Sequence, residues 1–101
     1  MTLSQAAVRT EHGASYLKRL CKHWSHRLEV EESEERADIN FGDGQIVRLS
    51  ADANTLKISI WDEAGSRLDR LQEVVSSHLE RFATKETLNF TWVRNDQAVL
   101  S

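Results

Sequence analysis

Residues 37–61 read ADINFGDGQIVRLSADANTLKISIW, and this stretch decides the fold. It holds three runs in which apolar and polar side chains alternate, which is the period of a strand with one buried face. Two short turn sequences separate the runs, Gly42-Asp43-Gly44 and Asp52-Ala53-Asn54. Turns this short join neighbouring antiparallel strands. The segment therefore predicts a three-stranded antiparallel meander with these inward positions: Ala37, Ile39, Phe41, Val47, Leu49, Ala51, Leu56, Ile58 and Ile60.

A helix and two short strands are predicted before this meander. Residues 5–9 alternate around Ala6 and Val8, and residues 28–31 alternate around Leu28 and Val30, so each run is expected to be a strand. Between about residues 12 and 27 the apolar side chains recur instead at helical spacing and form one stripe. That stripe consists of Leu17, Leu20, Cys21, Trp24 and Leu28.

A second helix and a last strand are predicted after the meander. Ser66 and Asp69 have the spacing of a capping box, which predicts that the helix starts there. Residues 88–92 alternate and are expected to form the closing strand, whereas residues 98–101 are expected to fray. The stripe of the second helix consists of Leu68, Leu71, Val75, His78, Leu79 and Phe82, and the strand alternates around Leu88, Phe90 and Trp92.

The predicted order is β-α-β-β-β-β-α-β in a single domain, residues 1–101. Each strand has one apolar face and each helix one apolar stripe, so both helices are expected on one face of a curved antiparallel sheet. The expected fold class is an α+β two-layer sandwich. This order resembles the topology of TATA-box-binding-protein-like and helix-grip folds with one strand added, a likeness that carries no function by itself.

The composition argues against several functional classes. The chain has 101 residues, of which 40% are hydrophobic and 29% charged, with a formal net charge of −3. No apolar run approaches the ~20 residues of a membrane span, and the start of the chain lacks the features of a signal peptide. Net negative charge opposes general nucleic-acid binding, which depends on neutralising phosphates. Because the lone Cys21 cannot form an internal disulfide, we expect a reducing, cytoplasmic location.

No catalytic motif marks the chain as an enzyme. The sequence contains no GxSxG, Walker or GxGxxG pattern. Its carboxylates are numerous, but no pattern pairs two of them as acid and base. We therefore expect no catalysis by this domain alone.

The histidines near Cys21 suggest a zinc site that helical geometry largely rejects. At ~100° per residue Cys21 and His23 point roughly 200° apart, so one ion cannot bind both. His12 and His23 share a face but lie about 16 Å apart along the helix axis. His23 and His26, three residues apart, are the pair able to meet on one metal, with the remaining ligands supplied from elsewhere.

Trp61 is a candidate interface residue. It occupies the polar phase of its strand and therefore lies on the face of the sheet away from the helices. A tryptophan there is expected to be solvated unless a ligand, a dimer partner or the start of the second helix covers it. Both a monomer and a homodimer are consistent with the residue patterns.

Two stretches of the chain resemble the bacterial family named domain of unknown function 2218. They are YLKRLCKHWSHR at residues 16–27 and VVSSHLERFA at residues 74–83, the latter followed by Glu86-Thr87-Leu88 and by Trp92. Order and spacing also fit, so the resemblance covers essentially the whole chain. It implies that the recurrent polar residues, and hence the candidate ligand or metal residues, are Cys21, His23, His26, His78 and Arg81.

The resemblance implies a role without naming an activity. Some similar domains are joined to siderophore-interacting flavin reductases or lie among iron-uptake genes. The leading hypothesis is therefore a small binding or accessory domain in iron or siderophore handling, with such a reductase or a small ligand as partner. The alternatives are a histidine-based accessory to a reductase that binds iron, another metal or haem, and a homodimeric scaffold joined through Trp61.

The resemblance also draws attention to His23 and His78. His23 lies at the flank of the first helical stripe and His78 at the edge of the second. If the helices pack side by side, the two rings are expected to face one another across the groove. Direct ligation of one ion requires each nitrogen at ~2 Å from the metal, so a ring separation beyond ~10 Å would rule the idea out.

Overall fold

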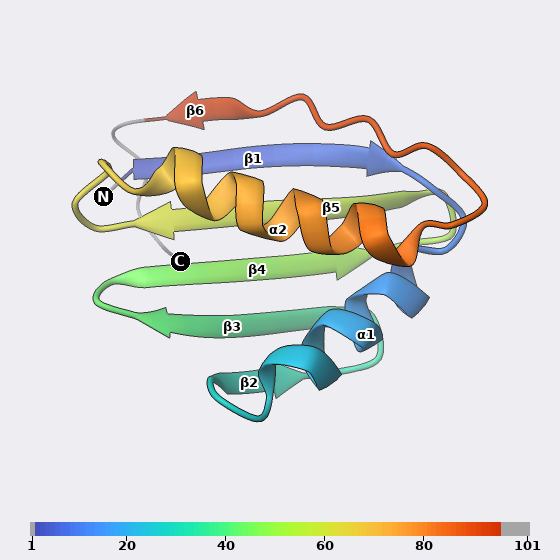
Figure 1. Ribbon diagram of the computed structural model, residues 1–101, viewed down its shortest axis with the longest axis horizontal. Coiled ribbons are helices and arrows are strands. Elements are labelled where there is room, and N and C mark those ends of the chain that lie inside the picture. Colours follow the sequence, from blue (N-terminus) through green and yellow to red (C-terminus); the bar gives the residue numbers. More distant parts are fainter. Residues whose placement is uncertain (1, 96–101) are drawn as a thin grey trace.

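The computed structural model describes residues 2–95 and shows a six-stranded antiparallel sheet with two helices on one face (Figure 1). Across the sheet the strands follow the order β2-β3-β4-β5-β1-β6. The predicted α+β class, element order and helical face are confirmed. In chain order the elements are β1 (Thr2–Arg9), α1 (Gly13–Trp24), β2 (Glu29–Glu32), β3 (Arg36–Gly42), β4 (Gln45–Ala51), β5 (Thr55–Asp62), α2 (Leu68–Phe82) and β6 (Val93–Asn95).

The predicted meander forms strands β3, β4 and β5. Val47 stands opposite Ile39 on one side and opposite Ile60 on the other, and all three side chains are fully buried beneath the helices. The turn between β3 and β4 has positive φ at Gly42, Asp43 and Gly44. Glycine adopts such angles without a steric clash, so this turn sequence sets the register of the hairpin.

Strand β1 lies next to β5 and pairs with it along its whole length, from Thr2 opposite Asp62 to Arg9 opposite Thr55. The chain then crosses the sheet as α1, which packs on β2 to β5, while α2 packs on β5 and β1. The apolar stripe of α1 is buried as predicted, but the helix ends at Trp24 rather than near residue 27. Within residues 2–95 neither helix is long and apolar enough to cross a membrane.

The start of α2 is held by Asp62, and the predicted capping box is wrong. The N-cap residue is Arg67, and no side chain caps the helix. Asp62, fully buried at the end of β5, instead accepts hydrogen bonds from the Arg67 backbone at 2.8 Å, the Arg67 guanidinium at 2.9 Å and the Ala64 amide at 3.3 Å. A carboxylate from the preceding strand, rather than Asp69, therefore binds the backbone N–H of the N-cap residue.

The closing strand is shorter and later than predicted. Residues 87–92 form no strand, and β6 pairs instead through Val93–Asn95 with residues 3–5 of β1. Residues 87–92 run beside β1 (Figure 1), with Leu88 buried and with Phe90 and Trp92 packed against the core. The alternation of apolar and polar residues in this segment therefore reflects the burial of alternate side chains, which does not require pairing with another strand. The expected fraying of residues 98–101 lies outside the described residues.

Asp62 is expected to contribute strongly to stability. Burial raises the pKa of its carboxyl, but the hydrogen bonds from Arg67 outweigh burial and the net pKa is lowered. Asp62→Ala leaves the Arg67 charge and two amides without their acceptor and should reduce the free energy of unfolding by about 3 kcal/mol, measured by urea denaturation at pH 7. The exposed Asp69→Ala should change it by less than about 0.5 kcal/mol.

The same group fixes the sign of a pH effect. A lowered native pKa means that the stabilisation is complete above the unfolded pKa of about 3.9 and is lost as the pH falls through the native pKa. The difference between wild type and Asp62→Asn should therefore shrink in acid below about pH 4. Equal stability of wild type and Asp62→Ala at pH 7 would contradict this role.

Candidate functional site

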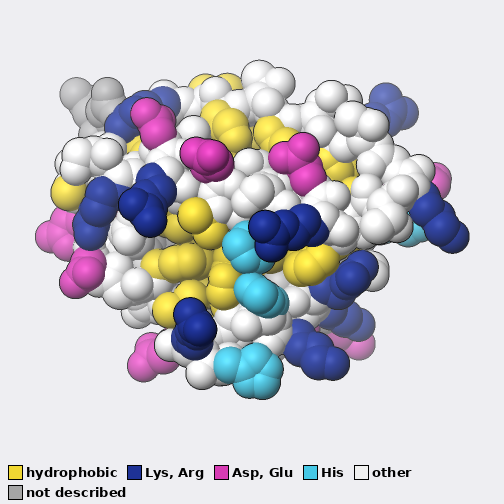
Figure 2. Space-filling model, in the orientation of Figure 1, with side chains coloured by type: hydrophobic (Ala, Val, Ile, Leu, Met, Phe, Trp, Pro, Cys, Tyr) yellow, Lys and Arg dark blue, Asp and Glu magenta, His cyan; other side chains and the backbone are white. Residues whose placement is uncertain are grey.

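His23 of α1 and His78 of α2 are in contact. Their ring centroids lie 4.9 Å apart with the ring planes tilted by 56°. The prediction that the two rings face one another is confirmed, because their separation is well below the ~10 Å that would have ruled out a shared ion. We call these two residues the histidine pair. Figure 2 shows histidine side chains side by side on the helical face, next to a hydrophobic patch and near Lys and Arg side chains.

Hydrogen bonding fixes the tautomer of His78. Its Nδ1 lies 2.7 Å from the carbonyl oxygen of Val74, one turn earlier in α2. A carbonyl oxygen only accepts, so Nδ1 carries the proton, and in the neutral ring Nε2 keeps a free lone pair. Because His78 is half-buried while His23 is exposed, His78 is the ordered member of the pair.

Aromatic side chains support the histidine pair from below. The ring of buried Trp24 lies 5.1 Å from His78 and 6.0 Å from His23, centroid to centroid. Phe41 of β3 packs edge-on against Trp24 at 5.0 Å. We call the surface along the seam between α1 and α2, where the histidine pair lies over Trp24 and Phe41 packs beside them, the interhelical groove. Phe41 extends this surface toward the turn between β3 and β4.

Cationic side chains lie near the histidine pair. Arg19, one turn before His23 in α1, lies over the Phe82 ring at 4.5 Å. Arg81 follows His78 by three residues in α2, is exposed, and pairs with no group in residues 2–95. Within the same residues no carboxylate forms an ion pair with His23 or His78. The electrostatic setting therefore favours an anion over a bare metal cation.

The structure does not bring Cys21 or His26 to the histidine pair. Cys21 faces the sheet, is 1% exposed, and has its pKa raised to about 11 by burial and by Glu32 of β2. A thiol with this pKa is protonated at neutral pH and is a poor metal ligand. His26 lies exposed in the turn after α1. In the described part of the chain, no three His, Cys, Asp or Glu side chains form a group able to hold a metal ion.

Trp61 is not solvated but buried within the chain, beneath a side chain of the neighbouring strand. It lies on the predicted face of the sheet but is only 5% exposed. The Arg48 guanidinium covers its ring at 5.2 Å, and the Asp38 carboxylate holds that guanidinium at 2.7 Å. The strand period gave the correct face but did not reveal a covering cation from β4. Burial removes the reason for choosing Trp61 as a dimer contact.

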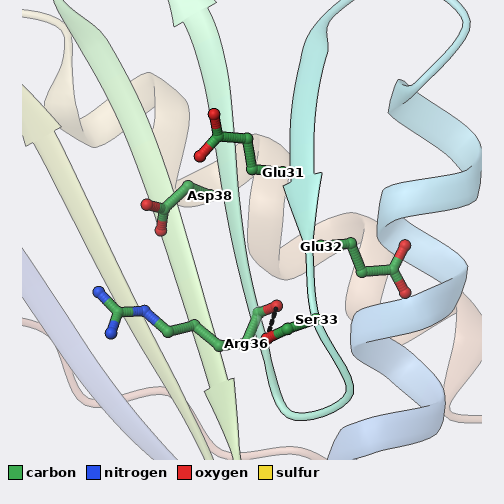
Figure 3. A pocket seen from close by; sticks show the side chains of 5 residues that line it. All are labelled: Glu31, Glu32, Ser33, Arg36 and Asp38. Atoms are coloured by element: carbon green, nitrogen blue, oxygen red, sulfur yellow. Dashed lines mark hydrogen bonds between the residues drawn. The ribbon is translucent and has the colours of Figure 1, made fainter.

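An acidic hollow beside β2 lacks convergent geometry. It measures about 230 Å³ and is lined by Glu31, Glu32, Ser33, Arg36 and Asp38. Figure 3 shows Glu32 pointing toward α1, whereas Glu31 and Asp38 point to the other side of the strands. These carboxylates therefore do not converge on one ligand.

A second hollow was missed by the sequence analysis. It measures about 390 Å³, adjoins the interhelical groove, and is lined by Phe41, Gln45, Arg67, Arg70, Leu71 and Val74. We call it the arginine hollow. The sequence places two of its apolar residues, Phe41 and Leu71, on buried faces, and the spacing of Arg67, Arg70, Val74 and His78 along one helical row is the only pattern that marks this surface.

Comparison with known proteins gives a family and a solved relative. The family described as an uncharacterised protein conserved in bacteria, DUF2218, matches residues 5–93. The protein PA4090 of Pseudomonas aeruginosa, solved by NMR, is similar in structure with a TM-score of 0.79 and 40% sequence identity. That similarity covers 92% of this chain and 96% of PA4090. No protein with a curated description matches the chain significantly.

The hydrogen bond of His78 predicts its protonation pattern. In long-range ¹H–¹⁵N correlation spectra above the titration of the imidazoles, His78 should show the Nδ1–H tautomer, with Nε2 unprotonated. The exposed His26 should show the mixture usual for a solvated ring. A protonated Nε2 in neutral His78 would contradict the hydrogen bond to Val74.

Proposed function

The chain belongs to the DUF2218 family of bacterial proteins, and on that premise we propose that it is a non-enzymatic accessory domain that binds a small iron chelate in the interhelical groove. The observation that carries the proposal is the contact between His23 and His78 at 4.9 Å. Two imidazoles from separate helices meet at the surface, where a ligand can reach them. A purely structural histidine would more often have its ring nitrogens satisfied inside the core.

The chemistry of the groove suits a chelate better than a free ion. The half-buried Phe41 offers apolar surface backed by the buried Trp24, while Arg19 and Arg81 supply positive charge. An iron chelate built from catecholates is negatively charged and presents flat aromatic edges. Such a ligand would exchange its contact with water for contact with the groove floor and would be attracted by the arginines.

The link to iron rests on the family resemblance. Some domains similar to this one are joined to siderophore-interacting flavin reductases, which suggests a reductase of this kind as the partner. A domain that holds the chelate near such an enzyme would raise its local concentration. The proposed location is the cytoplasm, where the single cysteine would stay reduced.

Direct metal binding by the histidine pair is a second candidate. A zinc–nitrogen bond of ~2.0–2.1 Å places each imidazole centroid about 3 Å from the ion, and two centroids about 5 Å apart at a tetrahedral angle. The observed 4.9 Å fits this geometry. The residues of the groove supply only these two ligands, so the ion would need further ligands from solution. Haem would use only one of the rings, because two rings in contact leave no room for a macrocycle between them.

Titration with a gallium(III) tris-catecholate complex, a diamagnetic stand-in for the ferric chelate, tests the first candidate. Backbone amide NMR signals around His23, Trp24 and His78 should shift. His78→Ala should weaken binding about 10-fold or more, because a hydrogen bond to a charged ligand is lost. His26→Ala, which removes an exposed histidine outside the pair, should leave the affinity unchanged. Absence of shifts up to millimolar complex, or shifts confined to another face, would refute the proposal.

Zn(II), Fe(II) and haem, followed by optical and NMR titration, test the second candidate. If the histidine pair binds the ion, His23→Ala and His78→Ala should each reduce affinity at least 10-fold, and His12→Ala should not. No binding below millimolar concentration would eliminate direct metal or haem binding while leaving the chelate proposal standing.

A further inference from the structure

We infer that the arginine hollow binds an aromatic carboxylate, with its ring on Phe41, Leu71 and Val74 and its acid group paired with Arg70. The inference rests on the proposed function for the location of the binding surface. It adds the chemical class of ligand for the end of the groove farthest from the histidine pair.

The walls and size of the hollow fit an aromatic ring. Three apolar side chains line it, Phe41 from β3 and Leu71 and Val74 from successive turns of α2. Its volume of about 390 Å³ lies in the range of small-molecule sites, ~300–1,000 Å³. A flat ring of one or two cycles covers such a surface with little loss of its own conformational freedom.

The charge of the hollow points to an acid group on that ring. Arg70 is exposed and has no partner in residues 2–95. Arg67 is less available to a ligand, because its guanidinium already donates hydrogen bonds to the buried Asp62 carboxylate at 2.9 Å and to the Asp43 carbonyl at 2.8 Å. No carboxylate lines the hollow, so Arg70 presents an uncompensated positive charge beside an apolar surface. A carboxylate pairs with guanidinium through two parallel hydrogen bonds.

The hollow is held in shape before any ligand arrives. The Arg67 guanidinium joins the start of α2 to the turn between β3 and β4. Phe41, just before that turn, is fixed from behind by edge-on packing against Trp24 at 5.0 Å. Preformed walls reduce the ordering cost of binding.

Two residues that line the hollow connect it to the histidine pair through contacts. Val74 lines it and also accepts the hydrogen bond from His78, while Phe41 contacts Trp24, which contacts His78. Arg70 and His78 are eight residues apart, about 12 Å along the helix axis. A ligand held by its acid group at Arg70 and long enough to span this distance would reach His78.

The probe that tests this inference is 2-naphthoate, with 2-naphthamide as the neutral analogue and acetate as the anion without a ring. Naphthoate should shift the amide signals of Phe41, Arg70 and Val74, with a Kd near 1 mM, as expected of a fragment with about 13 non-hydrogen atoms. Naphthamide and acetate should each bind at least 10-fold more weakly. Shifts by acetate alone would indicate a simple anion site and would overturn the inference.

Two variants that each remove one positive charge test whether the acid group of the ligand pairs with Arg70. Arg70→Met retains an unbranched side chain but removes the charge. It should weaken naphthoate binding about 10-fold and leave the affinity for naphthamide unchanged. Arg9→Met, at the far end of β1 on the other face of the sheet, should change neither. Equal naphthoate affinity of wild type and Arg70→Met, or equal affinity of wild type for naphthoate and naphthamide, would overturn the inference.

The naphthoate experiments can fail or succeed independently of the chelate titration that tests the proposed function. Gallium tris-catecholate binding that depends on His78, together with no response to naphthoate, would overturn this inference alone. Naphthoate binding that depends on Arg70, together with no chelate binding, would support an aromatic-acid site and refute the iron-chelate proposal.

Discussion

The buried carboxylate of Asp62 is the constraint on which the arrangement of this molecule depends. It lies at the end of β5, fully removed from solvent, and receives hydrogen bonds from the backbone and side chain of Arg67. The same guanidinium reaches the Asp43 carbonyl in the turn between β3 and β4. One buried charge therefore fixes a strand, a turn and the start of a helix relative to one another. Because α2 is a regular helix from Leu68, the positions of Arg70, Val74 and His78 follow from that anchor.

The sequence predicts the fold well wherever side-chain period and burial agree. The alternation in residues 37–61 identifies β3, β4 and β5 because their inward side chains, apart from the half-buried Phe41, are buried. Two local predictions fail for physical reasons. Alternation around Leu88 and Trp92 reflects packing against the core, which does not require a hydrogen-bonded strand. The capping box at Ser66 fails because Asp62, four residues earlier and buried, binds the backbone there.

Parts of the candidate site were likewise predictable from the sequence and other parts were not. The meeting of His23 and His78 was predictable because helical phase places each at the edge of a stripe and the sheet aligns the helices. The arginine hollow was not, because apolar period marks Leu71 as facing inward without showing that the packing beside it is incomplete. Trp61 illustrates a third limit: the strand period places both Trp61 and Arg48 on the open face, but it does not show that the Arg48 side chain packs over the Trp61 ring.

Strand β2 forms one edge of the sheet and carries glutamate at three of its four positions, Glu29, Glu31 and Glu32. An edge strand offers unpaired backbone groups to any other strand that approaches. A second molecule aligning its own β2 against this edge would bring two rows of carboxylates together, and their repulsion would oppose the backbone pairing. The acidic edge thus opposes sheet-to-sheet association at this border of the molecule.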